Sequence, residues 1–368
     1  MFSRSAVIVA ISVCGLGRLV FAANPLTEYP AAKPGDAGYV AEDPELAQLV
    51  GRLAPNIALR SIDGSTINIV KTYGHKPVYL KLWATYCIPC RAQTPGFEKI
   101  YERNGTKVQI VAVDVGIGDE PAKVRKFVAE ANMHMPVAID DGSLAGWLKL
   151  DSTPVHLLIG MDGRIAYAGH RDGPPLDAAL ERVLGGKRPA RIETTDIQSV
   201  AVLRPGDVVP SIELRGPDNS PVELVRPGRP RAVLFTATWC ESYLKGTQPE
   251  TVEACRRARE QADALSQNGS VEWLGVVTRL WTTTKGLASY ETRMKPRVPM
   301  AVDTEGKAFQ KFGVQSFPAV ALIDADGHLF RLVGPEDNDL ATSIEELAAR
   351  HKKSRLPESR NVPQVGVR

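Results

Sequence analysis

Cysteine is scarce in this sequence, with five residues in 368. A small secreted protein held together by disulfides would carry many more, so that class is excluded. Cys14 lies near the start of the chain, and the others are Cys87, Cys90, Cys240 and Cys255. Only Cys87 and Cys90 have the two-residue spacing of redox motifs and zinc sites, and the second pair of ligands that zinc usually needs is missing. We therefore expect redox chemistry without a metal or a cofactor.

The sequence also lacks a strong excess of charge of one sign. Its formal net charge is +3, which is too small to indicate a nucleic-acid partner. The hydrophobic fraction of 43% and the charged fraction of 24% are ordinary for a globular protein. The length favours two domains, because one domain usually takes roughly 100 to 200 residues.

A run of about 20 apolar residues, long enough to cross a membrane, is missing as well. The first segment has instead the pattern of a secretory signal peptide. Arg4 gives a basic start, residues 6–16 are apolar, and Val20-Phe21-Ala22 fits a cleavage site. We expect export to the periplasm with a mature chain beginning near Ala23. An uncleaved N-terminal membrane anchor is the alternative, and it would leave the domains on the same side of the membrane.

The chain contains two copies of one structural unit. Each copy begins with a predicted β-hairpin and continues with a buried strand that ends at a cysteine, at Cys87 and at Cys240. Helices and strands then alternate, and a late strand in each copy starts at an X-Pro pair, Thr153-Pro154 and Phe317-Pro318. The predicted fold class is α/β, with two tandem domains that each hold a central mixed β-sheet flanked by helices. The expected boundaries are a signal peptide at 1–22, an N-terminal extension at 23–50, a first domain at 51–186, a linker at 187–208, a second domain at 209–352 and a tail at 353–368.

Cys87 stands between a buried strand and a predicted helix, so it occupies the helix N-terminus. Unpaired N–H groups and the helix dipole favour a thiolate there, and the thiolate is the attacking species in disulfide exchange. Cys90 lies one turn further on and can reach Cys87. Pro89 suits the first helical turn, where its missing N–H would be unpaired anyway. The spacing predicts a nucleophile at Cys87 and a resolving thiol at Cys90.

The segment Trp83 to Arg91 resembles the active-site motif of thioredoxin-fold proteins of the exported TlpA/ResA type, which serve cytochrome c maturation and related thiol reduction. The resemblance covers most of each repeat and includes Pro95 in the first helix. It implies a cis peptide bond at Thr153-Pro154 beside the cysteine pair, with Thr153 offering backbone hydrogen bonds to an extended substrate. The substrate-binding residues that it implies are Trp83, Tyr86, Pro89, Thr153 and Pro154.

Lys81 departs from the family pattern, because relatives often carry Asp or Asn at this strand position, six residues before the first cysteine. A charged lysine cannot accept the proton of Cys90. It would favour the Cys87 thiolate if it points toward the site, or it extends to solvent with its stem on apolar surface. Both possibilities stay open in the sequence, so Lys81 is a candidate auxiliary residue.

The second copy lacks a resolving cysteine, because Tyr243 stands at the position that corresponds to Cys90. We expect Cys255 to lie on the same helix as Cys240, roughly 22 Å away and out of disulfide reach, as a small buried apolar residue. The second domain is then a degenerate structural or substrate-holding module. Two further roles of Cys240 stay open, monothiol exchange and a direct relay with the first pair. Trp239 and Phe317 would flank this site and are candidates to bind an apolar partner.

These observations predict an enzyme that reduces disulfides in protein substrates such as apocytochrome c or metallochaperones, with electrons from a membrane thiol carrier, as the resemblance implies. The alternative is a copper-binding thioredoxin-fold chaperone that uses Cys87, Cys90 and a histidine, His156 or His170. Related copper chaperones space their cysteines by three residues, which counts against it. A peroxidase is excluded because the required Thr is replaced by Ala84 and Ala237.

Overall fold

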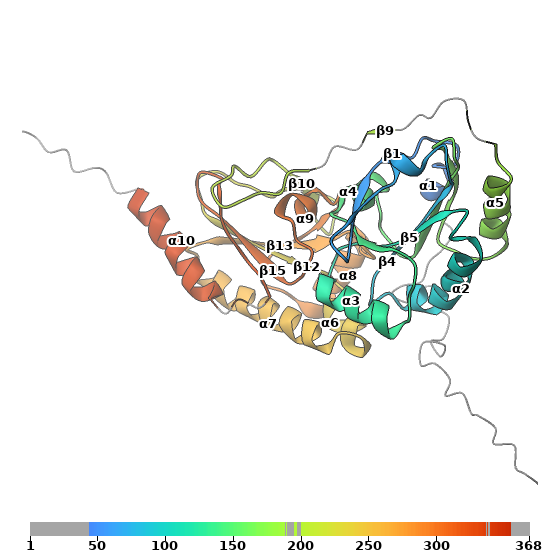
Figure 1. Cartoon of the computed structure of the whole chain (residues 1–368). Coiled ribbons are helices and arrows are strands. Elements are labelled where there is room, and N and C mark those ends of the chain that lie inside the picture. Colours follow the sequence, from blue (N-terminus) through green and yellow to red (C-terminus); the bar gives the residue numbers. More distant parts are fainter. Residues whose placement is uncertain are drawn as a thin grey trace, which may run out of the picture.

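The computed structural model describes residues 44–187, 189, 195, 196, 200–335, 337 and 339–354, and it forms two α/β domains of the same plan (Figure 1). The predicted signal peptide, most of the N-terminal extension and most of the tail lie outside the described residues. Within the part of the chain that is described, no helix is both long and apolar enough to cross a membrane.

The first domain is built on one seven-stranded sheet in the order β3-β2-β6-β5-β4-β7-β8. Strands β4, β5 and β6 run parallel, and the other neighbours pair in antiparallel fashion. Its elements are α1 (Pro44–Ala47), β1 (Pro55–Asn56), β2 (Ala58–Ser61), β3 (Thr66–Asn68), the 3₁₀ helix η2 (Val70–Thr72), β4 (Val78–Trp83), α2 (Ile88–Asn104), β5 (Gln109–Asp114), α3 (Pro121–Glu130), β6 (Val137–Ile139), α4 (Ser143–Trp147), β7 (Val155–Ile159), β8 (Ile165–Gly169) and α5 (Pro174–Leu184).

The second domain repeats this sheet in the order β11-β10-β14-β13-β12-β15-β16. The predicted fold class, two tandem domains with mixed sheets, is therefore confirmed. Its elements are β10 (Glu213–Arg215), β11 (Pro221–Glu223), β12 (Arg231–Thr236), α6 (Cys240–Tyr243), η3 (Leu244–Gly246), α7 (Pro249–Leu265), η4 (Ser266–Asn268), β13 (Glu272–Thr278), α8 (Thr284–Met294), β14 (Met300–Asp303), α9 (Lys307–Phe312), β15 (Ala319–Ile323), β16 (Leu329–Val333) and α10 (Leu340–Ser354). Between the domains, β9 (Thr195–Asp196) pairs with β1.

The central strands β4 and β12 are buried along their whole length. Strands covered on both faces are mostly apolar and do not alternate, which is why these segments stand out in the sequence despite Lys81 in β4 and Arg231 in β12. The fold begins before residue 51, because Leu46 of α1 is buried in the first-domain core and the Gly51 N–H donates to the Ile165 carbonyl at 2.8 Å.

The helix after the second-domain cysteine is broken, and this corrects the sequence prediction. The first four residues form α6, a 3₁₀ turn follows, and Gln248 leaves the helical region with φ −140° and ψ 66° before α7 begins at Pro249. Proline lacks an N–H and disfavours a helical residue before it, so it starts a new helix here. In the first domain the corresponding Pro95 lies inside the continuous helix α2.

This break brings Cys240 and Cys255 together in a disulfide with a Cα–Cα distance of 6.4 Å. The predicted separation of roughly 22 Å was wrong because it assumed a single straight helix. Cys255 is therefore not an isolated apolar filler, and in this disulfide Cys240 has no free thiol for monothiol exchange.

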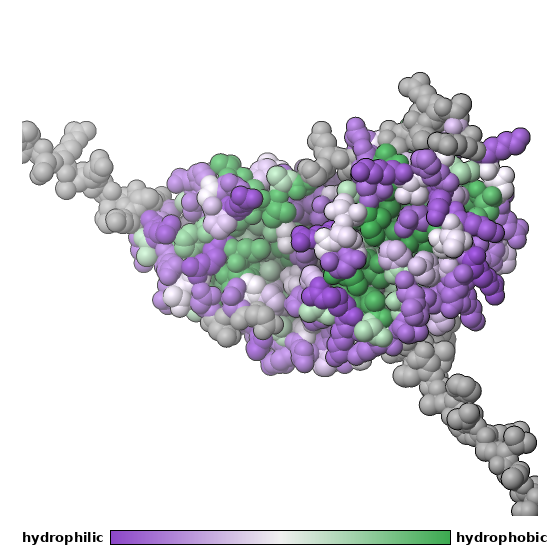
Figure 2. Space-filling view, in the orientation of Figure 1, coloured by the Kyte–Doolittle hydropathy of each residue, from purple (hydrophilic) through white to green (hydrophobic). Residues whose placement is uncertain are grey.

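The two domains meet at their cysteine-bearing ends, and one cluster of buried apolar residues continues from the first domain into the second. Tyr86 belongs to it on one side and Trp239 on the other, with ring centroids 5.2 Å apart. Figure 2 shows a largely polar exterior with apolar side chains visible in the middle of each half. The shared cluster makes the domain boundary a packed interface.

Candidate active site

Cys87 caps the N-terminus of α2, directly after the turn that follows β4. Its sulfur accepts a hydrogen bond from the backbone N–H of Cys90 at 3.2 Å, and the two cysteines form a disulfide with a Cα–Cα distance of 5.2 Å. Pro89 lies in the first helical turn, as predicted. The expectation that Cys90 reaches Cys87 is confirmed. An amide N–H aimed at the Cys87 sulfur stabilises negative charge there once the disulfide is reduced.

Lys81 points toward this pair and is only 2% exposed. Its Nζ donates to the Cys90 carbonyl oxygen at 3.5 Å and lies 5.1 Å from the centre of the Phe97 ring. Burial lowers the pKa of Lys81 to about 7, although the negative charge of Asp172 acts in the opposite direction and raises this pKa. The possibility that this side chain extends to solvent is therefore wrong. A substantial fraction of the amine is neutral near pH 7, and a neutral amine can accept a proton.

A buried chain of hydrogen bonds lies beside the cysteine helix. The Tyr79 hydroxyl meets His156 Nδ1 at 2.6 Å, and His156 Nε2 meets the Gln93 side-chain oxygen at 2.9 Å. The Gln93 amide donates to the His170 carbonyl at 3.2 Å, and His170 Nδ1 lies 2.7 Å from the Pro154 carbonyl oxygen. Burial, followed by the Lys81 charge, holds the pKa of His156 well below its usual value. This chain ties α2 to β7 and to the loop that carries Pro154.

The predicted substrate-binding residues surround the pair but are covered in this arrangement. Trp83, Tyr86, Thr153 and Pro154 are buried, and Pro89 is half-buried. The Thr153–Pro154 peptide bond is cis, as the resemblance implied, and the Phe317–Pro318 bond is also cis. Contact of these residues with a substrate stays a prediction.

The second domain covers the cysteine pair, which the sequence did not predict. Cys87 is 0% exposed and Cys90 is 1% exposed. The Tyr243 hydroxyl accepts a hydrogen bond from the Ile88 N–H at 3.0 Å, immediately next to the nucleophile. Trp281 lies with its ring centroid 5.9 Å from that of Tyr86. The sulfurs are therefore enclosed at a domain interface.

Asp119 and Gln248 are buried polar residues beside the cysteine pair that sequence reasoning missed. Asp119 accepts hydrogen bonds from the Thr85 N–H at 2.6 Å and the Thr85 hydroxyl at 2.5 Å, which fixes the turn before Cys87. Gln248 of the second domain donates to Asp119 at 3.0 Å and to the Thr85 hydroxyl at 3.1 Å. Burial raises the pKa of Asp119, although the bonds from Thr85 act in the opposite direction. The only sequence signal was a polar residue directly before Pro249, at the break in the helix.

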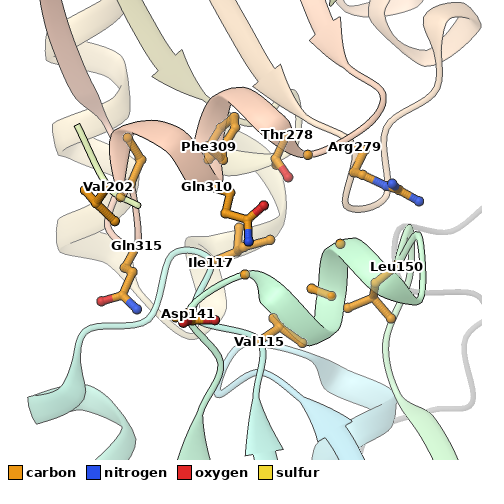
Figure 3. Close-up of a pocket in the computed structure, with 17 residues that line it drawn as sticks. Val115, Ile117, Asp141, Leu150, Val202, Thr278, Arg279, Phe309, Gln310 and Gln315 are labelled. Carbon is orange, nitrogen blue, oxygen red and sulfur yellow. The ribbon is translucent and has the colours of Figure 1, made fainter. Parts of the chain in front are cut away.

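A cleft of about 230 Å³ lies between the domains but contains no cysteine (Figure 3). Val115, Ile117 and Leu150 line its first-domain side, and Phe309, Gln310 and Gln315 line the other. It touches the site through Ile117, whose carbonyl oxygen accepts a hydrogen bond from the Tyr86 hydroxyl, and through Val115, whose N–H donates to the Trp83 carbonyl oxygen at 2.9 Å. Exchange chemistry is therefore assigned to the cysteine pair and not to this cleft.

Metal binding finds no support in the geometry. Among the described residues, no three His, Cys, Asp or Glu side chains gather closely enough to hold a metal ion. His156 and His170, the two candidate copper ligands, each have both ring nitrogens in hydrogen bonds. The arrangement does not favour the copper-chaperone alternative.

A cysteine pair that closes a disulfide at the start of a helix can pass between the dithiol and disulfide states. The first domain thus has the fold and site of a thioredoxin-like thiol-disulfide oxidoreductase. Residues 50–168 match the model of the AhpC/TSA family.

Curated relatives narrow this class. The thiol-disulfide oxidoreductase ResA of Bacillus cereus (strain ATCC 10987 / NRS 248) is 30% identical over 150 residues, which are 40% of this chain and 84% of that protein. ResA of Bacillus anthracis is 30% identical over 138 residues, 36% of this chain and 78% of that protein. The chain belongs to the family of ResA-type thiol-disulfide oxidoreductases. A solved structure of a putative thiol:disulfide interchange protein DsbE from Chlorobium tepidum is 26% identical, with a TM-score of 0.34 over 37% of this chain and 98% of that one.

Proposed function

We propose that this protein is an exported, periplasmic reductase that opens disulfides in partner proteins, with apocytochrome c or a metallochaperone as the substrate class. The observation that supports this most directly is the hydrogen bond from the Cys90 N–H to the Cys87 sulfur within a closed Cys87–Cys90 disulfide. A membrane thiol carrier would supply the electrons. The predicted leader supports export, and membership in the ResA-type family supports the direction of the reaction.

In each cycle the Cys87 thiolate attacks one sulfur of the substrate disulfide, and the other substrate sulfur leaves as a thiolate that takes up a proton. Cys90 then loses its proton and attacks the Cys87 sulfur of the mixed disulfide, which releases the second substrate thiol. The substrate gains two electrons, and Cys87 and Cys90 end as a disulfide. A dithiol on the carrier reverses this last change. Lys81, next to Cys90, is the candidate acceptor of the Cys90 proton.

The test is reduction of insulin by dithiothreitol, catalysed by the full mature chain. We expect the wild-type protein to accelerate it and the Cys87→Ser variant to lose the acceleration, whereas Cys240→Ser keeps it. Full activity in Cys87→Ser would overturn the assignment. Cys90→Ser is expected to hold partners as mixed disulfides on Cys87, and mass spectrometry of these adducts from a periplasmic extract identifies the substrate class.

A further inference from the structure

One short segment of the second domain makes several polar contacts next to the cysteine pair, and other contacts between the domains, such as the Trp281 N–H to the Asp151 carbonyl at 2.6 Å, lie outside this segment. Tyr243 binds the Ile88 N–H, and Gln248 binds Thr85 and Asp119. Lys123 of the first domain donates to the Thr251 hydroxyl at 3.2 Å. The second-domain residues lie between positions 243 and 251, so we call residues 240–255 the covering segment.

The covering segment begins with two very short helices and continues into α7. Helix α6 has four residues and η3 has three, and helices this short are unstable on their own. The Cys240–Cys255 disulfide closes the segment into a loop and restricts the conformations open to it. The crosslink is therefore the covalent restraint on the segment, and it acts together with the ion pair of Glu241 in α6 with Arg259 in α7 at 2.7 Å.

Contacts connect this disulfide to the active-site turn in three steps. The Cys240 sulfur lies 3.7 Å from the Thr251 carbonyl oxygen. The Thr251 hydroxyl donates to the Gln248 side-chain oxygen at 3.0 Å. The Gln248 amide donates to Thr85, in the turn before Cys87, and to Asp119, which accepts hydrogen bonds from that turn. A change at the disulfide thus reaches Gln248 through one intervening residue.

We propose that the Cys240–Cys255 disulfide is a redox clamp that holds the covering segment over Cys87 and Cys90, and that its reduction uncovers the catalytic pair. The inference rests on the proposed function and assigns a regulatory role to the second domain. A dithiol supplies two electrons and two protons, the Cys240–Cys255 bond breaks to give two thiols, and the dithiol becomes a disulfide. The residues Cys240 and Cys255 are 0% and 3% exposed, so this reduction follows local opening of the loop.

The test measures access to the catalytic disulfide without a protein substrate. The oxidised full chain is treated with dithiothreitol and quenched with an alkylating reagent, and each disulfide is quantified by mass spectrometry. We expect Cys87–Cys90 to be reduced at least roughly tenfold faster in the Cys240→Ala, Cys255→Ala double variant than in the wild type, because the loop restraint is lost. Arg256→Ala is the matched control, since its ion pairs stay within α7 and it should react at the wild-type rate.

Two measurements keep the proposal open to refutation if the double variant does not fold. Gln248→Ala keeps the clamp but loses its contact with the first domain, so it should also speed reduction of Cys87–Cys90 while Cys240–Cys255 is still intact. In the wild type, reduced Cys87–Cys90 should accumulate only with or after reduction of Cys240–Cys255. Complete reduction of the catalytic pair over an intact clamp, or equal rates in wild type and a folded double variant, would overturn the clamp. A double variant that is reduced quickly but does not act on insulin would overturn the proposed function alone.

Discussion

At the scale of single residues, burial has a clear effect on Lys81, because it lowers the pKa of the amine. It faces the Cys90 carbonyl and the Phe97 ring, and neither neutralises an ammonium. The lowered pKa, about 7, is the consequence. The same desolvation that makes the amine a proton acceptor also makes the charged form costly.

We expect Lys81→Met to raise the free energy of unfolding, with a gain that falls as pH rises. The unfolded lysine has its ordinary pKa of 10.5 and the folded one about 7, so the unfolded state binds more protons between these values and wild-type stability rises with pH there. The gain should be roughly 3 to 5 kcal/mol near pH 6 and close to zero near pH 10.5. Urea denaturation at several pH values measures it. The exposed Lys126, replaced by Met, is the control, and a gain for Lys81→Met that does not vary with pH would contradict the prediction.

At the scale of elements, the two domains start equivalent helices with a buried aspartate. Asp140 accepts from Leu144 through one oxygen at 3.0 Å and from Ala145 through the other at 2.8 Å. Asp303 uses one oxygen for both Ala308 and Phe309, at 2.8 and 3.0 Å. The copies thus differ in how many acceptor oxygens the helix start requires.

Replacing each aspartate by asparagine should affect the two helix starts differently. Asn at position 303 keeps both hydrogen bonds through its single carbonyl oxygen, whereas Asn at position 140 leaves one backbone N–H facing an amide NH₂ group. We expect Asp140→Asn to lower the free energy of unfolding by about 1 to 3 kcal/mol and Asp303→Asn to lower it by less. Chemical denaturation of the two variants, followed by circular dichroism, makes the comparison. Equal losses would show that the acceptor count does not matter.

At the scale of the whole molecule, Gly118 and Phe317 show how closely the domains pack. A Cβ atom added to Gly118 would lie 2.7 Å from the Phe317 ring. Gly118 also has φ +76°, where a side chain is strained. A side chain at position 118 would therefore destabilise the protein for two reasons. The clash with Phe317 arises at the domain interface, and the backbone strain arises within the first domain.

A double-mutant cycle separates the contribution of the clash from that of the backbone strain. Gly118→Ala should destabilise the protein, and Phe317→Ala added to it should recover the part that comes from the clash. We expect a coupling free energy of about 0.5 to 3 kcal/mol, obtained from the unfolding of the four proteins. Gly146→Ala is the control, because its Cβ would lie 3.8 Å from Gln310 at the same interface in ordinary contact. Strictly additive losses would show that the ring of Phe317 does not restrict position 118.

Features that depend on local sequence patterns could be predicted, whereas features that depend on contacts between residues far apart in the sequence could not. The apolar run ending at Cys87 and the turn signals around it predicted the sheets and the cysteine pair, because these depend on local periodicity. The disulfide between Cys240 and Cys255 was missed because it depends on the helix break at Pro249, and Pro95 at the equivalent place leaves its helix intact. The contact of Tyr243 with Ile88 joins residues 155 positions apart, and no local pattern specifies it.

Since both domains belong to one chain, the face of the second domain acts as a tethered competitor for the surface around Cys87. A tether of this kind gives an effective local concentration on the order of millimolar. A protein present at about micromolar concentration must therefore bind that surface roughly a thousandfold more tightly than the second domain does in order to displace it. Under the proposed function, the interface would set an affinity threshold, and proteins that bind the surface around Cys87 more weakly than this would keep their disulfides.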